Sequence, residues 1–210
     1  MRIERRDRTM ERNRQLGADI AEAAFTKGVD GRVCGEQCIL KCSQCGSSTC
    51  QCDCAPECPE APRALSADPD RYPVEPGITP LVFEMKRLGL VRPCWSCEGH
   101  LRPDGSLWKV PAVWFYAKSL VHVRLLASGL ERMRHAGKLS VSWRIAVTFS
   151  DPDNPETTFS LEPVRAFDNE PSLPALRNDV AEIARSLHGM MTGEARTLQR
   201  DAGKALAGNG

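Results

Sequence analysis

LSVSWRIAVTF, residues 139–149, alternates apolar and mostly polar side chains along its length. Because successive side chains of a strand point to opposite faces, this stretch has one apolar face and one wetter face. That pattern is typical of an antiparallel sheet packed on one side only. The turn-forming residues 151–155 follow, and residues 157–163 return as the predicted hairpin partner.

Helices and a second pair of strands are predicted on both sides of this hairpin. Residues 79–88 form a helix, with Thr79 as N-cap, Pro80 in the first turn and Gly89 at the end. Further elements are a short strand from Leu90, a loop at 93–104, a strand at 110–117 and helices at 118–136 and from Ser172 to about 191. Pro111 places the strand at 110–117 at an edge or at a strand start.

The order from residue 79 onward is therefore α-β-β-α-β-β-α. We expect an α+β sandwich in which helices cover one face of an antiparallel sheet of about four strands. Composition divides the whole chain into five parts. These are a charged helix (1–30), a cysteine-rich metal-binding module (31–60), a proline-rich linker (61–78), the sandwich (79–191) and a flexible tail (192–210).

Cysteine is the unusual component, with ten residues in a chain of 210, and eight of them lie between Cys34 and Cys58. They indicate either a disulfide framework or a metal site. The N-terminus has no apolar segment typical of a secretory signal, and no apolar run is long enough for a membrane helix. We therefore expect a cytoplasmic protein, in which clustered thiolates bind metal rather than oxidise.

Zinc is the favoured metal, because it prefers tetrahedral thiolate and imidazole sites. The segment from Cys34 to Cys58 contains no histidine or aromatic residue, so bound metal would have to supply its folding free energy. Two to three zinc ions are expected. The predicted ligands are Cys34, Cys38, Cys42, Cys45, Cys50, Cys52, Cys54, Cys58, Cys94, Cys97 and His100. Cys42 and Cys45 pairing with Cys94 and Cys97 would make a zinc-ribbon-like site.

Three short resemblances accompany this prediction. Cys94 to Gly99, with the pattern Cys-x2-Cys-x-Gly, resembles half of a zinc-binding repeat of the DnaJ chaperone family, which implies a metal knuckle but no chaperone role. The Cys-x-Cys-x-Cys run from Cys50 to Cys54 resembles metallothioneins and implies bridging thiolates. Cys38-x3-Cys42-x2-Cys45 resembles the cluster motif of radical S-adenosylmethionine enzymes, so an iron–sulfur cluster is a minor alternative.

The predicted loop at 93–104 is also the best candidate for chemistry. If Cys94, Cys97 and His100 held zinc with one open position, Glu98 could act as a general base on bound water. A closed structural site and a thiol–disulfide role for Cys94 and Cys97 are the alternatives. No other catalytic signature is present, so we expect a binding protein rather than an enzyme.

Charge is unevenly distributed, although the net charge is only +1. Residues 80–144 contain eleven Lys or Arg and four acidic residues, and they contain all four tryptophans. Basic groups among aromatic residues are typical of surfaces that bind nucleic acids or other anions. We therefore expect this segment to recognise a nucleic acid or a protein partner, and we expect no membrane partner.

Overall fold

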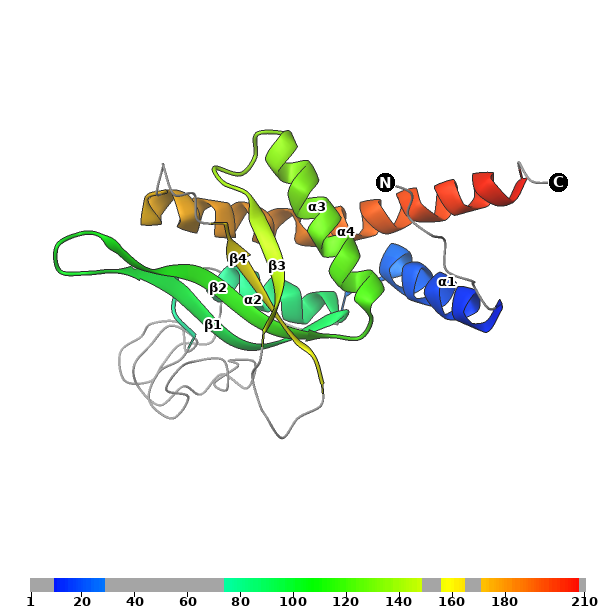
Figure 1. Cartoon of the computed structure of the whole chain (residues 1–210), viewed down its shortest axis with the longest axis horizontal. Helices are drawn as coiled ribbons and strands as arrows, with labels where there is room; N and C mark the ends of the chain where they lie inside the picture. Colours follow the sequence, from blue (N-terminus) through cyan, green and yellow to red (C-terminus); the bar gives the residue numbers. More distant parts are fainter. Residues whose placement is uncertain (1–9, 29–73, 149–155, 165–170, 208–210) are drawn as a thin grey trace, which may run out of the picture.

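The computed structural model describes residues 10–28, 74–148, 156–164 and 171–207 (Figure 1). Its elements are α1 (Met10–Phe25), α2 (Thr79–Leu88), β1 (Val91–Leu101), β2 (Leu107–Ala117), α3 (Leu120–His135), β3 (Trp143–Thr148), β4 (Thr158–Pro163) and α4 (Leu173–Ala207). The predicted order and the α+β class are confirmed. The eight cysteines from Cys34 to Cys58, with the predicted metal-binding module and most of the linker, lie outside the described residues.

The four strands form one antiparallel sheet in the order β1-β2-β4-β3. The predicted hairpin is present, with Trp143 paired to Pro163 and Thr148 to Thr158. Its first strand is shorter than predicted, because residues 139–142 are not extended. Pro111 lies in β2 opposite Glu98, beyond the end of the β2–β4 pairing, which begins at Val113. At that point β2 pairs only with β1, so the missing N–H of proline is tolerated.

The core lies between one face of this sheet and the helices. Val113 and Phe115 of β2 face the same side as their partners Leu161 and Phe159 of β4, and all four are buried. They belong to one cluster with apolar side chains of α2, α3 and α4. Helix α4 contacts α1, α2 and α3 as well as β1 and β2, and it runs through the molecule as its longest element (Figure 1).

The structure corrects the predicted loop at 93–104. Residues 91–101 form β1, which pairs with β2 over nearly its whole length, so the predicted Cys94–Cys97 turn is absent. The connection is the tight turn around Asp104 and Gly105, where Gly105 has φ +83°. Trp95 lies opposite Trp114, with 4.8 Å between ring centroids. The local Cys-x2-Cys pattern suggested a turn, whereas cross-strand pairing with β2 makes this segment extended.

Two helix boundaries also differ from the prediction. Thr79 is the first residue of α2 rather than its N-cap, and its buried hydroxyl donates to the carbonyl oxygen of Glu75 at 2.8 Å. Helix α4 continues to Ala207, so the predicted flexible tail from residue 192 is helical over most of its length. Met191 and Ala195 are fully buried. None of the described helices has the length and apolar character needed to cross a membrane.

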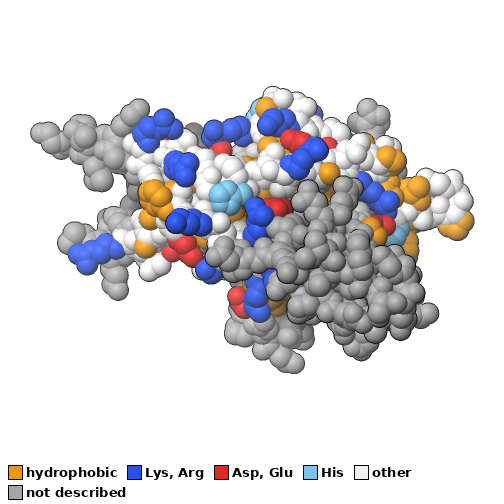
Figure 2. Space-filling view, turned by 180° about the vertical axis from the view of Figure 1, so that it is seen from behind, with side chains coloured by type: hydrophobic (Ala, Val, Ile, Leu, Met, Phe, Trp, Pro, Cys, Tyr) orange, Lys and Arg blue, Asp and Glu red, His pale blue; other side chains and the backbone are white. Residues whose placement is uncertain are grey.

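The surface opposite the view of Figure 1 is rich in basic groups. Figure 2 shows Lys and Arg side chains recurring along the described part of this face, with few acidic side chains between them. Basic residues of the segment 80–144 also meet basic residues of α4: Arg132 and Lys138 line one groove with Arg185, Arg196 and Arg200. Basic residues that are dispersed in the sequence are therefore brought together by the fold.

Candidate metal centre

Strand β1 is an edge strand, and it carries three of the predicted ligands, Cys94, Cys97 and His100. Cys97 and His100 are three positions apart. In a regular strand, residues three positions apart point to opposite faces. Gly99 lies between them with φ +83°, a conformation that side chains disfavour, and so interrupts the alternation. A Cβ at this position would lie 2.6 Å from Leu173 Cδ1 and 2.8 Å from Pro111 Cδ. Glycine is therefore required here by both conformation and space.

A third side chain reaches the same place from the segment before α2. The carbonyl oxygen of Glu75 accepts from the N–H groups of Ile78 and Thr79, each at 3.1 Å, as well as from the Thr79 hydroxyl. These contacts fix the backbone of Glu75 beside β1. Its carboxylate Oε2 then accepts from the backbone N–H of Glu98 at 2.7 Å, which satisfies a donor of the sheet edge.

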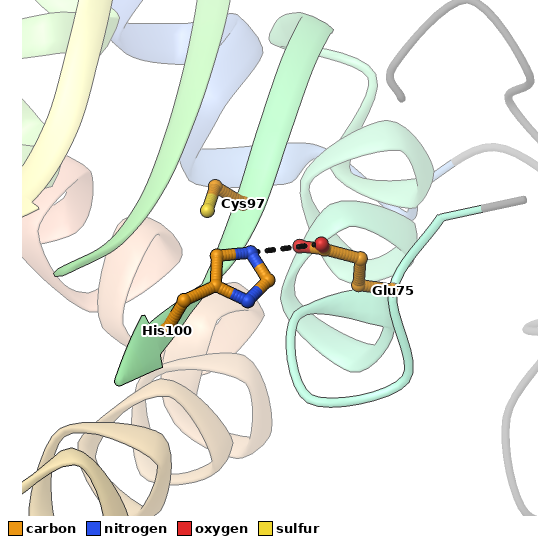
Figure 3. A group of neighbouring side chains, drawn as sticks. All are labelled: Glu75, Cys97 and His100. Carbon is orange, nitrogen blue, oxygen red and sulfur yellow. Dashed lines mark ion pairs between the residues drawn. The ribbon is translucent and has the colours of Figure 1, made fainter. Parts of the chain in front are cut away.

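Glu75, Cys97 and His100 form one group, in which the ligand atoms all lie within 4.8 Å of one another. Glu75 Oε1 lies 3.0 Å from His100 Nε2, and both side chains are about a third exposed. Cys97 is buried. Figure 3 shows the imidazole of His100 facing both the Cys97 sulfur and the Glu75 carboxylate. The group thus offers sulfur, nitrogen and oxygen donors with access from solvent.

The surroundings favour the neutral form of the Cys97 thiol. Burial raises its pKa, and the nearby carboxylates of Glu75 and Glu98 raise it further. The backbone N–H of Gly99 and the ammonium of Lys109 oppose these effects. Trp108 lies beside the group, and its ring centroid is 6.3 Å from that of His100. The ammonium of Lys109 lies over the indole ring of Trp108.

Glu98, the predicted general base, holds the neighbouring backbone in place. Its Oε2 accepts from the N–H of Gly77 at 2.6 Å, and its Oε1 accepts from Arg177 Nη2 at the same distance. Arg177 also donates to the carbonyl oxygens of Glu98 and Gly99. The Arg177–Glu98 ion pair joins β1 to the start of α4, and the Gly77 contact joins β1 to the turn before α2. Glu98 is not a member of the three-residue group, and its contacts give it a positioning role.

Cys94 lies apart from the group that contains Cys97, although both cysteines were predicted to bind one zinc ion. It sits at an irregularity in the β1–β2 register, between Pro93 and Trp95, and it packs against the hydrophobic core. Burial raises the pKa of its thiol to about 11. A raised pKa on both thiols disfavours the thiolate that a thiol–disulfide role requires, and zinc at Cys97 would have to displace the same proton.

The structure thus brings together two of the predicted ligands, Cys97 and His100, and adds Glu75. Glu75 is the residue that the sequence did not reveal, since it falls inside the predicted proline-rich linker. No local pattern marks it as a ligand. Its role depends on the packing of the segment 74–78 against β1, which is a tertiary contact.

Comparison of the chain with protein-family models, with curated proteins and with solved structures finds no match. The site is therefore interpreted from its own geometry and chemistry.

Proposed function

We propose that this chain is a cytosolic zinc-binding protein, with one ion held by Glu75, Cys97 and His100 and further zinc held by the cysteines between Cys34 and Cys58. The convergence of Glu75, Cys97 and His100 supports the first of these sites. The number and spacing of the cysteines support the second. The α+β domain then acts as the partner-binding part of the molecule.

The three donors suit zinc. Thiolate, imidazole and carboxylate are the groups that bind zinc in proteins, at about 2.0–2.3 Å from the metal. Ligand atoms of a tetrahedral site are then separated by about 3.3–3.8 Å. The separations of up to 4.8 Å require a contraction of about 1 Å, within the reach of side-chain rotation at the partly exposed Glu75 and His100. A hard cation such as magnesium would not favour the sulfur.

A structural role fits the contacts better than catalysis does. Zinc at this group would join the segment before α2 to the edge of the sheet, reinforcing the Glu75 and Glu98 contacts. Three protein ligands also leave one tetrahedral position for water, the arrangement found in catalytic zinc sites. However, both carboxylate oxygens of Glu98 already accept hydrogen bonds, so the enzyme alternative lacks the base on which it was built.

The decisive measurement is zinc content per chain, by elemental mass spectrometry, for the purified protein and three variants. Cys97→Ser, His100→Ala and Glu75→Gln each remove one donor of the group. We expect Cys97→Ser and His100→Ala to lose close to one ion per chain, whatever number the cysteine-rich segment holds. Glu75→Gln retains a weak oxygen donor, and we expect it to bind the same ion at least tenfold more weakly.

His135→Ala is the matched control, because His135 is exposed and pairs with Glu131 on α3, outside the group. Circular dichroism spectra must show that every variant is folded. Full zinc content in both Cys97→Ser and His100→Ala would refute the site. Iron and a brown sample in place of zinc would favour the iron–sulfur alternative at Cys38, Cys42 and Cys45, which lie outside the described residues.

A further inference from the structure

A groove of about 710 Å³ lies between α3 and α4, away from the metal group. The two helices approach closely at Gly129, where a Cβ would lie 2.2 Å from Met190. Met133 and Met190 contribute apolar surface to the groove. Gly189 and Gly193 of α4 also line it, and a Cβ added at either would meet nothing within 4 Å. These glycines leave open space along α4.

The charged side chains that line this groove are mostly basic: Arg132, Lys138, Arg185, Arg196 and Arg200, against one acid, Glu194. The acid is buried and already neutralised, because Arg132 donates to both of its oxygens. Arg185 pairs with Glu182. In the part of the chain that the structure describes, no carboxylate forms an ion pair with Lys138, Arg196 or Arg200. The groove therefore carries a net positive charge, which favours an anionic ligand.

The length of the basic row favours an extended polyanion over a single small anion. Arg185 and Arg200 are fifteen residues apart on α4, which at 1.5 Å per residue is about 22 Å. One phosphate or sulfate could contact only one end of this row. One strand of a duplex carries a phosphate about every 3.4 Å along the axis, so the row could follow about six of them.

We propose that the α3–α4 groove binds the phosphate backbone of a nucleic acid. None of the described residues that line it is aromatic, so these residues offer no ring on which bases could stack as they do in single-strand-binding proteins. Binding by phosphate contacts alone is independent of base sequence and falls steeply with salt. This proposal identifies the partner of the proposed function, but it rests on charges that do not touch the zinc group.

The test is fluorescence anisotropy of the full chain with a labelled 20-base-pair duplex and with a 20-nucleotide oligothymidine, titrated at several salt concentrations. We expect the affinity for the duplex to fall steeply between about 50 and 200 mM salt, because each phosphate contact releases counterions from the DNA. Lys138→Ala combined with Arg200→Ala should weaken binding at least tenfold and reduce the salt slope by about two, one for each cation removed.

Gly193→Glu gives an independent variant that should not disturb folding, because its side chain enters open space in the groove and glutamate favours helix more than glycine does. It should weaken binding at least tenfold, while Gly193→Gln, its uncharged match, should weaken it far less. Arg134→Ala is the control for charge alone, since Arg134 is an exposed residue of α3 outside the groove.

Absence of nucleic-acid binding at 50 mM salt would overturn the proposal. Equal binding by wild type, the Lys138 and Arg200 double variant and Gly193→Glu would also overturn it. Tighter binding of a polyglutamate peptide than of either oligonucleotide would assign the groove to an acidic protein instead. The zinc content of each groove variant should equal that of wild type, so failure here is distinguishable from failure of the metal site.

Discussion

Gly99 connects backbone conformation to the metal group at the scale of a single residue. Cys97 and His100 reach one another only because the strand between them departs from the regular pleat. The same residue allows close contact with Leu173 of α4 and Pro111 of β2. Glycine adopts a φ of +83° readily, whereas a residue with a Cβ does not, so this conformation depends on Gly99.

We expect Gly99→Ala to lower stability by about 1–3 kcal/mol from the backbone alone, with an additional cost from the contacts at 2.6 and 2.8 Å. It should also weaken zinc binding by about tenfold, because the side chains of Cys97 and His100 would change direction relative to one another. Gly105→Ala is the matched control, since Gly105 has the same φ of +83° but open space around it. Urea denaturation and zinc titration measure both effects. Equal zinc affinity in the two variants would show that Gly99 does not position the ligands.

Asp179 fixes the connection between two elements, α4 and the entry to β3. This buried carboxylate accepts from the backbone N–H groups of Ser140 and Val141, from the Ser140 hydroxyl and from the indole N–H of Trp143. The backbone donors of Ser140 and Val141 are therefore used by a side chain rather than by a neighbouring strand. This explains why β3 begins at Trp143, although the alternating pattern begins at Leu139.

Asp179→Ala leaves several buried donors without a partner, and we expect it to lower the free energy of unfolding by about 2–4 kcal/mol. Asp179→Asn should lose less, because its carbonyl oxygen still accepts. Asp201→Ala, at an exposed position of the same helix, is the control. Denaturant midpoints measure all three. A wild-type midpoint for Asp179→Ala would mean that water replaces the carboxylate without cost.

At the scale of the whole molecule, α4 joins elements that are far apart in sequence. Arg177 pairs with β1, Asp179 binds the entry to β3, and Glu194 accepts from Ser128 and Arg132 of α3. Toward its C-terminal part, Arg196 donates to the carbonyl oxygen of Ala24 in α1. Helix α4 also determines where charge gathers. Residues 145–210 are net acidic, yet α4 contributes Arg185, Arg196 and Arg200 to the basic groove.

The sequence predicted those parts of the fold that depend on local periodicity. The hairpin of β3 and β4 follows from the alternation of apolar and mostly polar residues, although Val147, on the predicted apolar face, is 72% exposed. Helices α2 and α3 follow from apolar stripes with clear stop signals. Strand β1 could not be predicted in the same way, because proline, glycine and two cysteines interrupt its pattern and its extended form depends on pairing with β2. Of the three-residue group, Cys97 and His100 were predicted and Glu75 was not, since only tertiary packing brings it there.

The C-terminal part of α4 gives the last prediction. Its buried apolar face continues through Leu187, Met191 and Ala195. Because the side chain of Ala195 is small, the periodicity of the sequence does not show that this residue is buried. Removing residues 192–210 deletes Glu194 and Arg196, leaves Arg132 unpaired and exposes core around Met191. We expect a loss of at least about 3 kcal/mol, since hydrogen bonds to a buried charge contribute about 1.5–3 kcal/mol. Urea denaturation measures this loss, and removal of residues 208–210 alone is the control.

Hydrogen exchange should also show faster exchange in α1, because α4 holds α1 through Arg196 and through packing. If both truncated proteins unfold at the urea concentration of the full chain, this end of α4 contributes nothing to the core and the fold is stabilised by its first half alone.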